Sequence, residues 1–358
     1  MSEPIKATME AVVLTGPGEF HIDEVPTPRP GGGEVLCRVE STTICGTDIH
    51  IIQGAHRPRW PPRYPAILGH EWAGRIVALG DGAGGYGFEV GDCVAGTSHS
   101  GCGVCRQCLT GRYNLCENYG RADLAHRQYG HITQGSYAEY MVNTLKSIHK
   151  VPTEMPFDVA SNVDPAACGL HSVKRAGIAP GDTVVVLGPG PIGAFAFECA
   201  RALGAGRVLV VGSGKRLERL AAQGAETVDY KCEDAVRAVR ERTGGRGAQV
   251  VVDTAGTPDS LAWAVEMAAR GGRVAYTGIP DRPPQLAYKR IVLDELDIVG
   301  VRANPNAGPE VVPLIHCGRI RVAPYITHRF PLREYREAFE TYVERRDGAI
   351  LINLTPGA

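Results

Sequence analysis

Hydrophobic and polar positions follow two different patterns along this chain. Residues 11–155 contain short runs rich in Val and Ile, such as 35–39 and 76–79, and clusters of Gly and Pro separate these runs. Brief apolar runs between turn residues are typical of β-strands joined by loops. This part of the chain is therefore predicted to be a mostly β unit with long loops.

From about residue 165 the pattern alternates between strands and helices. Strands are expected at 183–187, 207–211, 249–252, 272–277 and 297–301, and helices at 191–204 and 217–223. Such alternation predicts βαβ units and a parallel sheet that is covered on both faces. The end of the chain combines a helix at 335–345 with strands near Ile326 and Ile350, so it is expected to return to the first unit.

Composition and charge exclude several classes of protein. The chain has 358 residues, 44% hydrophobic and 22% charged, which fits a globular protein of two or three domains. The 38 Lys and Arg residues nearly balance the 39 Asp and Glu residues, so nucleic acid is not expected as a partner. No apolar run is long enough for a membrane span or a signal peptide, so we expect a cytoplasmic protein without a membrane partner.

A glycine-rich turn between an expected strand and an expected helix points to a nucleotide. Gly188, Gly190 and Gly193, with Pro191 and Ile192 between them, have the G-x-G-x-x-G spacing. Glycines allow a tight turn and close backbone approach, and the N-terminus of the following helix attracts a pyrophosphate. The pattern alone is weak in a chain with 45 glycines and fits a plain turn, but the strand and helix around it favour a dinucleotide site.

The end of the next strand indicates which dinucleotide binds. NAD sites usually carry an acidic residue here for the ribose hydroxyls, whereas this chain has Gly212, Ser213, Lys215 and Arg216. A small residue, a hydroxyl and two cations suit a 2′-phosphate, so NADP(H) is predicted in preference to NAD(H). The alternative is that the two cations belong to a solvated helix start. Two residues after the expected 272–277 strand complete the predicted cofactor site: Gly278 and Ile279.

Four of the eleven cysteines are close together in the sequence. Cys102, Cys105, Cys108 and Cys116 offer four thiolates for a closed tetrahedral site, which is typical of structural Zn²⁺. An iron–sulfur cluster is the main alternative, because it also uses four thiolates. The residues at about 99–118 are therefore predicted to form a lobe that a metal holds together.

Two shorter motifs are informative only in combination with the motifs described above. Cys45, Thr47, His50, His70 and Glu71 each fit an ordinary core or turn position when taken alone. Together with the cysteine loop and the glycine-rich turn, in this order, they resemble the zinc-dependent medium-chain alcohol dehydrogenases. The resemblance is strongest to the branch of threonine and sorbitol-type polyol dehydrogenases. The segments that carry it are 44–51, 68–71, 90–92, 102–116, 137–140 and 188–193.

The resemblance implies a particular α/β architecture. A GroES-like, mostly β catalytic domain would span residues 1–163 and 303–358, and a Rossmann domain with a doubly wound parallel sheet would span 164–302. Members of this family also lead us to expect a homodimer or homotetramer.

The resemblance further implies a catalytic Zn²⁺ that Cys45 and His70 bind directly, with Glu71 beside them as a ligand or exchangeable partner. Asp164 occupies the position of a further ligand, bound directly or through water, and Cys168 is a weaker candidate. Bound Zn²⁺ favours the alkoxide form of an alcohol. Thr47 and His50 are then predicted to relay the proton to solvent, because a hydroxyl can donate and accept and an imidazole titrates near neutrality.

Two departures from the family pattern affect the prediction. Gly212 replaces the acidic residue that is usual in the NAD-dependent threonine and sorbitol enzymes. The segment 117–131 is longer than the family pattern leads us to expect and carries Tyr119, Arg127, Tyr129 and His131. This segment fits either a contact with a hydroxyl-rich substrate or a solvated surface loop.

The sequence therefore predicts a dehydrogenase with two Zn²⁺ per chain that moves a hydride between NADP(H) and a secondary alcohol or its ketone, with a polyol or amino-polyol as the expected substrate. The alternatives are an NAD-dependent threonine- or sorbitol-type enzyme and an NADP-binding regulatory protein without catalysis. A zinc-free reductase of the same fold is disfavoured, because such proteins lack Cys45, His70 and the cysteine loop.

Overall fold

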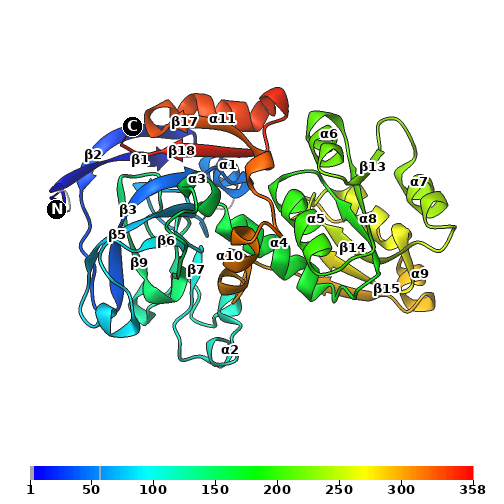
Figure 1. The fold of residues 1–358 in the computed structure, drawn as a ribbon, viewed down its shortest axis with the longest axis horizontal. Coiled ribbons are helices and arrows are strands. Elements are labelled where there is room, and N and C mark those ends of the chain that lie inside the picture. Colours follow the sequence, from blue (N-terminus) through cyan, green and yellow to red (C-terminus); the bar gives the residue numbers. More distant parts are fainter. Residues whose placement is uncertain (1–3, 56–57, 358) are drawn as a thin grey trace. The chain divides into compact units, whose positions relative to one another are not determined.

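The computed structural model describes residues 4–55 and 58–357, which divide into two compact units (Figure 1). The first unit comprises residues 1–164 and 326–358, and the second comprises residues 165–325. Residues 303–325 therefore belong to the second unit, whereas we expected the return to the first at residue 303. Burial explains the difference, because Val311, Ile315 and Tyr325 are buried and the Tyr325 hydroxyl donates a 2.6 Å hydrogen bond to Glu198 of the second unit.

The first unit is built from mostly antiparallel sheets, in which only β17 and β18 pair in parallel among the strands of the described residues. The largest has the strand order β10-β6-β5-β3-β18-β17, with β9 paired to β3, and a smaller one has the order β2-β1-β4. Strand β18 pairs with β3, so strands from both ends of the sequence belong to the same sheet. The strands are β1 (Thr8–Gly16), β2 (Glu19–Pro26), β3 (Glu34–Thr43), β4 (Ala66–Ile67), β5 (Glu71–Leu79), β6 (Cys93–Gly96), β7 (His99–Ser100), β8 (Arg127–Gln128), β9 (Tyr140–Thr144), β10 (Ile148–Lys150), β17 (Ile326–Pro331) and β18 (Leu351–Thr355).

Short helices lie between these strands. They are α1 (Gly46–Ile52), α2 (Arg106–Leu109), α3 (Phe157–Ala160) and α11 (Tyr335–Glu344), and α4 (Val163–Arg175) begins in this unit and continues into the second. The apolar core of the unit includes Leu14, Ile44, Ile51 and Phe339, which are buried against one another. Helix α1 thus packs into the core directly after β3, and this fixes the turn that contains Cys45.

The second unit contains a six-stranded sheet in which every pair is parallel. Its strands are β11 (Thr183–Leu187), β12 (Arg207–Gly212), β13 (Glu226–Asp229), β14 (Ala248–Asp253), β15 (Ala268–Tyr276) and β16 (Asp297–Gly300). The order β13-β12-β11-β14-β15-β16 is that of a Rossmann fold. In the central strand β11, residues 184–187 are all buried, so both faces of the sheet are covered.

The helices of the second unit follow its strands (Figure 1). They are α5 (Pro191–Ala202), α6 (Gly214–Ala222), α7 (Ala235–Arg242), α8 (Pro258–Met267), α9 (Tyr288–Leu293) and α10 (Gly308–His316). Helix α5 contacts β11 and β12, and α8 contacts β14 and β15. No helix within residues 4–55 and 58–357 is both long and apolar enough to cross a membrane.

Candidate metal centres and cofactor site

Three potential metal donors meet in the first unit. The ligand atoms of Cys45, His70 and Glu71 lie within 4.8 Å of one another. Strand pairing brings them together, because Thr43 of β3 is opposite Glu71 of β5 in the antiparallel register. Glu71 and His70 are nearly fully buried, whereas Cys45 retains partial exposure. A buried set of three donors with one accessible side is the arrangement that a catalytic metal site needs.

The turn before His70 depends on a glycine. Gly69 has φ +87°, and a Cβ there would lie 2.6 Å from Cδ1 of Tyr137. Gly130 and Gly135 also pack against the backbone carbonyl of Gly69, with no room for side chains of their own. This close packing fixes the backbone that presents His70 and Glu71.

Asp48 links the donors and was assigned no role from the sequence. Its Oδ2 accepts hydrogen bonds from the Cys45 backbone N–H at 3.0 Å and from the Tyr137 hydroxyl at 2.6 Å. Its Oδ1 lies 3.5 Å from Nδ1 of His70, and the side chain is fully buried. A carboxylate at one ring nitrogen orients the histidine and leaves the other nitrogen for a metal. The position of an acidic residue in the first turn of α1, three residues after Cys45, was the signal available in the sequence.

The electrostatics of the three donors fit a cation. Burial and the neighbouring Glu71 raise the pKa of the Cys45 thiol to about 11. Burial, with Asp164 and Asp48 nearby, raises the pKa of Glu71 to about 8. Burial alone lowers the pKa of His70, but Asp48 and Cys45 outweigh it and raise this pKa well above its ordinary value. A divalent cation reverses this balance and stabilises the deprotonated donors, so the residues suit Zn²⁺.

The other predicted members of this site are placed differently. Asp164 lies in the first turn of α4, where its Oδ1 accepts a 2.8 Å hydrogen bond from the Ser98 backbone N–H. Neither Asp164 nor Cys168 belongs to the group of three donors within the described residues. Thr47 is half-buried and His50 is exposed, both on α1. The roles of Asp164, Thr47 and His50 therefore stay predictions.

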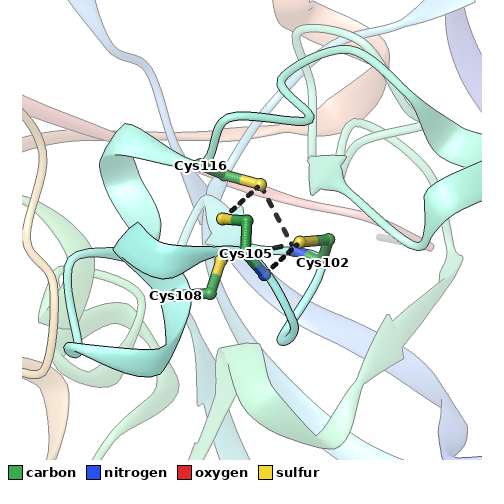
Figure 2. Close-up of side chains that lie close together, drawn as sticks. All are labelled: Cys102, Cys105, Cys108 and Cys116. Atoms are coloured by element: carbon green, nitrogen blue, oxygen red, sulfur yellow. Dashed lines mark hydrogen bonds between the residues drawn. The ribbon is translucent and has the colours of Figure 1, made fainter.

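The four cysteines of the loop converge on one point (Figure 2). The sulfurs of Cys102, Cys105, Cys108 and Cys116 lie within 4.8 Å of one another, and all four cysteines are free. The Cys105 backbone N–H and the Asn118 side-chain amide donate hydrogen bonds to Sγ of Cys102, at 3.4 Å and 3.3 Å. Such donors stabilise thiolates in a closed four-sulfur shell.

The thiols of this cluster differ in their proton affinity. Backbone hydrogen bonding, mainly from Val104, lowers the pKa of Cys102 to about 6, and that of Cys105 is lowered as well. Burial raises the pKa of Cys108 to about 12 and also raises that of Cys116. Cys102 is therefore ready to bind a cation as a thiolate near neutral pH, the lowered pKa of Cys105 favours the same form, and a bound cation favours the loss of the remaining protons.

In the second unit, the glycine-rich turn has the expected geometry. Gly188 directly follows β11 with φ +101°, and a Cβ at Gly193 would lie 1.8 Å from the Gly188 carbonyl oxygen. Pro191 begins α5, whose free N–H groups face the turn. The hydroxyl of Thr254 donates to the Leu187 carbonyl at 2.8 Å and ties the turn to the end of β14. A pyrophosphate is suited to this helix N-terminus.

Other predicted cofactor residues lie at the ends of neighbouring strands. Gly278 follows β15, and a Cβ there would lie 2.2 Å from the Gly256 backbone nitrogen. Ile279 is exposed, so its side chain is accessible to a cofactor.

The end of β12 excludes an acidic side chain. A Cβ at Gly212 would lie 2.6 Å from Cδ of Pro189, so no larger residue fits without a shift of the glycine-rich turn. The Ser213 hydroxyl donates a 3.2 Å hydrogen bond to the Tyr230 hydroxyl. Lys215 is exposed and Arg216 is half-buried in the first turn of α6. Tyr230 follows β13 and was not predicted, because residues of different strands meet here only through the parallel sheet.

Comparison with known proteins identifies the family. Residues 31–153 match the alcohol dehydrogenase GroES-like domain, and residues 191–316 match the zinc-binding dehydrogenase domain. The chain is 33% identical to a sorbitol dehydrogenase of Halalkalibacterium halodurans over 97% of this chain and 99% of the relative. It is also 33% identical to an L-threonine 3-dehydrogenase of Bacillus subtilis over 92% of this chain and 94% of the relative. The chain belongs to the zinc-dependent medium-chain alcohol dehydrogenase family.

Solved structures agree with this assignment and carry either nicotinamide cofactor. A putative zinc-binding dehydrogenase from Sinorhizobium meliloti bound to NADP has a TM-score of 0.87 and 29% identity, over 98% of this chain and 100% of its own. An Escherichia coli structure described as a short chain alcohol dehydrogenase with NADH has a TM-score of 0.88 and 27% identity, over 98% and 100%. The protein is thus a zinc-dependent, NAD(P)-linked oxidoreductase that acts on CH–OH groups of small alcohols.

Proposed function

We propose that this enzyme oxidises a secondary alcohol of a polyol or amino-polyol to the ketone with NADP⁺, and catalyses the reverse reduction with NADPH. The observation that carries the cofactor choice is the contact of Gly212 with Pro189, which leaves no space for an acidic side chain at the ribose position. Lys215 and Arg216 supply positive charge in the next helical turn, and charge-assisted hydrogen bonds to a phosphate suit these groups.

We also propose two Zn²⁺ per chain. Cys45, His70 and Glu71 would hold the catalytic ion, with Asp164 as a further ligand directly or through water. Cys102, Cys105, Cys108 and Cys116 would hold the structural ion, and four thiolates of this kind also suit an iron–sulfur cluster. Elemental analysis of the purified protein is expected to give about two zinc per chain, and iron in place of the second zinc would overturn the structural assignment.

When bound, the catalytic Zn²⁺ supplies Lewis acidity that lowers the pKa of a substrate hydroxyl. Thr47 would accept the hydroxyl proton and pass it to His50, whose exposed position allows its release to water. The two residues are three positions apart on α1 and therefore share one side of the helix. Asp48 would keep the His70 ring in place throughout.

The polyol or amino-polyol class rests on the relatives named sorbitol dehydrogenase and threonine 3-dehydrogenase. The main alternative is an NAD-dependent enzyme of the same type, which the neighbour complexed with NADH favours. An inactive regulatory protein is a weaker alternative, because the donor set of Cys45, His70 and Glu71 is complete. We further propose a homodimer or homotetramer, which sedimentation equilibrium tests.

A cofactor titration tests the proposal most directly. NADPH is expected to bind at least about tenfold more tightly than NADH, since an additional charge-assisted contact to the 2′-phosphate contributes about 1.5–3 kcal/mol. Binding is measured by the fluorescence of the reduced nicotinamide. Arg216→Gln should weaken NADPH binding and leave NADH binding unchanged, with Arg237→Gln on exposed α7 as the matched control. Tighter binding of NADH by the wild-type enzyme would refute the cofactor choice.

A further inference from the structure

The segment 117–131 was open to two interpretations, a surface loop or a substrate contact, and the structure connects it to the metal donors. The ring of His131 lies 4.4 Å from the ring of His70, measured between centroids. His131 is 5% exposed, and its Nδ1 lies 2.8 Å from the Tyr129 carbonyl oxygen. A carbonyl oxygen can only accept, so this contact assigns the proton of a neutral imidazole to Nδ1 and makes Nε2 an acceptor.

A row of polar aromatic contacts continues outward from His131. The ring of Trp60 lies 4.9 Å from that of His131 in an edge-to-face arrangement. The Trp60 indole N–H donates a 2.6 Å hydrogen bond to the Tyr119 hydroxyl, which in turn donates to the Gln128 side-chain carbonyl. Trp60 and the segment 117–131, which are far apart in the sequence, thus supply one continuous cluster.

This cluster is anchored rather than loosely exposed. Gln128 is 2% exposed and belongs to β8, where it pairs with His99 of β7. Trp60 and Tyr119 are half-buried. A solvated loop would direct its aromatic and amide groups to water. Here the side chains contact one another instead, and the innermost of them, His131, packs against the potential metal donor His70.

We propose that His131, Trp60, Tyr119 and Gln128 form a specificity-determining wall beside the catalytic metal donors, which selects hydroxyl-rich substrates over apolar secondary alcohols. The inference rests on the proposed function and narrows its substrate class. Nε2 of His131 accepts a hydrogen bond from a substrate hydroxyl next to the reacting carbon. An apolar substrate displaces water from these polar groups without replacing the hydrogen bonds, and this is the penalty that gives selectivity.

The first test replaces His131 with phenylalanine, which retains an aromatic ring against His70 and Trp60 and removes both ring nitrogens. We expect kcat/KM for sorbitol to fall about 10- to 100-fold and kcat/KM for 2-butanol to change by less than about threefold. Zinc content should equal that of the wild type. His21→Phe, at an exposed position of β2, is the matched control and should leave the ratio of the two kcat/KM values unchanged.

The second test removes only the hydroxyl that bridges Trp60 and Gln128. Tyr119→Phe should lower the same sorbitol to 2-butanol ratio about 2- to 10-fold, since one hydrogen-bonding group that orders the wall is lost. Tyr86→Phe, which removes a hydroxyl from an exposed tyrosine of the same unit, is the control.

The outcomes separate this inference from the proposed function. An equal loss of kcat/KM for both substrates in His131→Phe would show that His131 only supports His70. Unchanged kcat/KM values for both substrates would show that His131 does not contact substrate. Either result would contradict the proposal that the wall determines specificity. A wild-type enzyme that oxidises 2-butanol but none of a panel of polyols and amino-polyols would overturn the substrate class as well. If the wild type oxidises polyols and His131→Phe leaves its selectivity unchanged, the proposed specificity wall is wrong and the proposed function stands.

Discussion

Cys102 and Cys45, which belong to the two groups of metal donors in the first unit, lie in opposite electrostatic environments. In the four-cysteine loop, backbone N–H groups lower the pKa of Cys102 to about 6. In the three-donor group, burial and a neighbouring carboxylate raise the pKa of Cys45 to about 11. The loop backbone therefore stabilises the thiolate of Cys102, whereas Cys45 depends on a bound cation to stay deprotonated, as Cys108 and Cys116 of the loop also do.

The difference fits the two roles that we propose, a structural ion in the loop and a catalytic ion in the three-donor group. A closed set of four sulfurs saturates a tetrahedral ion and holds a lobe that has little apolar core of its own. Three donors, one of them partly exposed, leave a position for substrate. Asp48 orients this second group from the side, and no equivalent carboxylate contacts the four sulfurs among the contacts of the described residues.

The comparison predicts the largest loss of activity for Cys45→Ser. Turnover should fall roughly 1,000-fold, because several kcal/mol of charge stabilisation disappear with the catalytic ion. Steady-state kinetics and zinc analysis measure the effect, and one zinc per chain should remain in the loop. Exposed Cys232→Ser is the control. Turnover like that of the wild type would exclude Cys45 as a ligand.

Asp48→Asn should have the next largest effect. The amide keeps the shape of the side chain but removes the negative charge next to His70, so affinity for the catalytic zinc should fall about 10- to 100-fold. Competition with a chromogenic chelator measures this affinity, and Asp23→Asn at an exposed position provides the comparison. If affinity is unchanged, the orientation of His70 does not depend on Asp48.

Cys105→Ser should separate stability from catalysis. Loss of the structural ion is expected to lower the melting temperature by about 10 °C, because metal binding contributes directly to folding. Turnover at 25 °C should fall only about tenfold, as the three-donor group stays intact. Calorimetry and kinetics on the same preparation distinguish the two effects. A loss of turnover as large as that of Cys45→Ser at an unchanged melting temperature would assign catalysis to the loop.

Asp164→Asn should have the smallest effect, about threefold on kcat/KM, since the amide oxygen can still accept the hydrogen bond from Ser98 and face a cation. The measurement is the kcat/KM of the zinc-loaded variant relative to wild type, with Asp158→Asn at a more exposed position for comparison. A loss comparable to that of Cys45→Ser would make Asp164 a direct ligand and the three-donor description incomplete.

Much of the fold follows from local pattern. The strand predicted at 183–187 is confirmed at its exact residues as β11, and the helix predicted at 335–345 is confirmed as α11, one residue shorter. The helix predicted at 217–223 begins three residues earlier, at Gly214, because α6 starts directly after the turn that ends β12. Helix α10 was not predicted. Its Pro313 interrupts the usual helical signal, whereas buried Val311 and Ile315 hold it in the second unit.

The residues of the candidate sites also divide into those that local spacing predicts and those that only tertiary contacts reveal. The four-cysteine cluster was readable from spacing alone, since its ligands are neighbours along one loop. Asp48, Tyr137 and Tyr230 received no role from the sequence, because their contacts cross from one element to another. The segment 117–131 stayed open to two interpretations for the same reason, and the contact of His131 with His70 supports our proposal that its C-terminal end contacts substrate.

The sequence by itself determined the family, the alternation of strands and helices through most of the second unit, and the residue types that suit zinc and a dinucleotide, but it missed strand β13 and helix α10. These properties depend on the spacing of residues close together in the sequence, because local sterics and local hydrogen bonds determine them. The tertiary structure decided which donors meet, that Pro189 closes the space beside Gly212, and that the last strand pairs with β3. Such contacts join distant residues through sheet register and close packing, which no local pattern specifies.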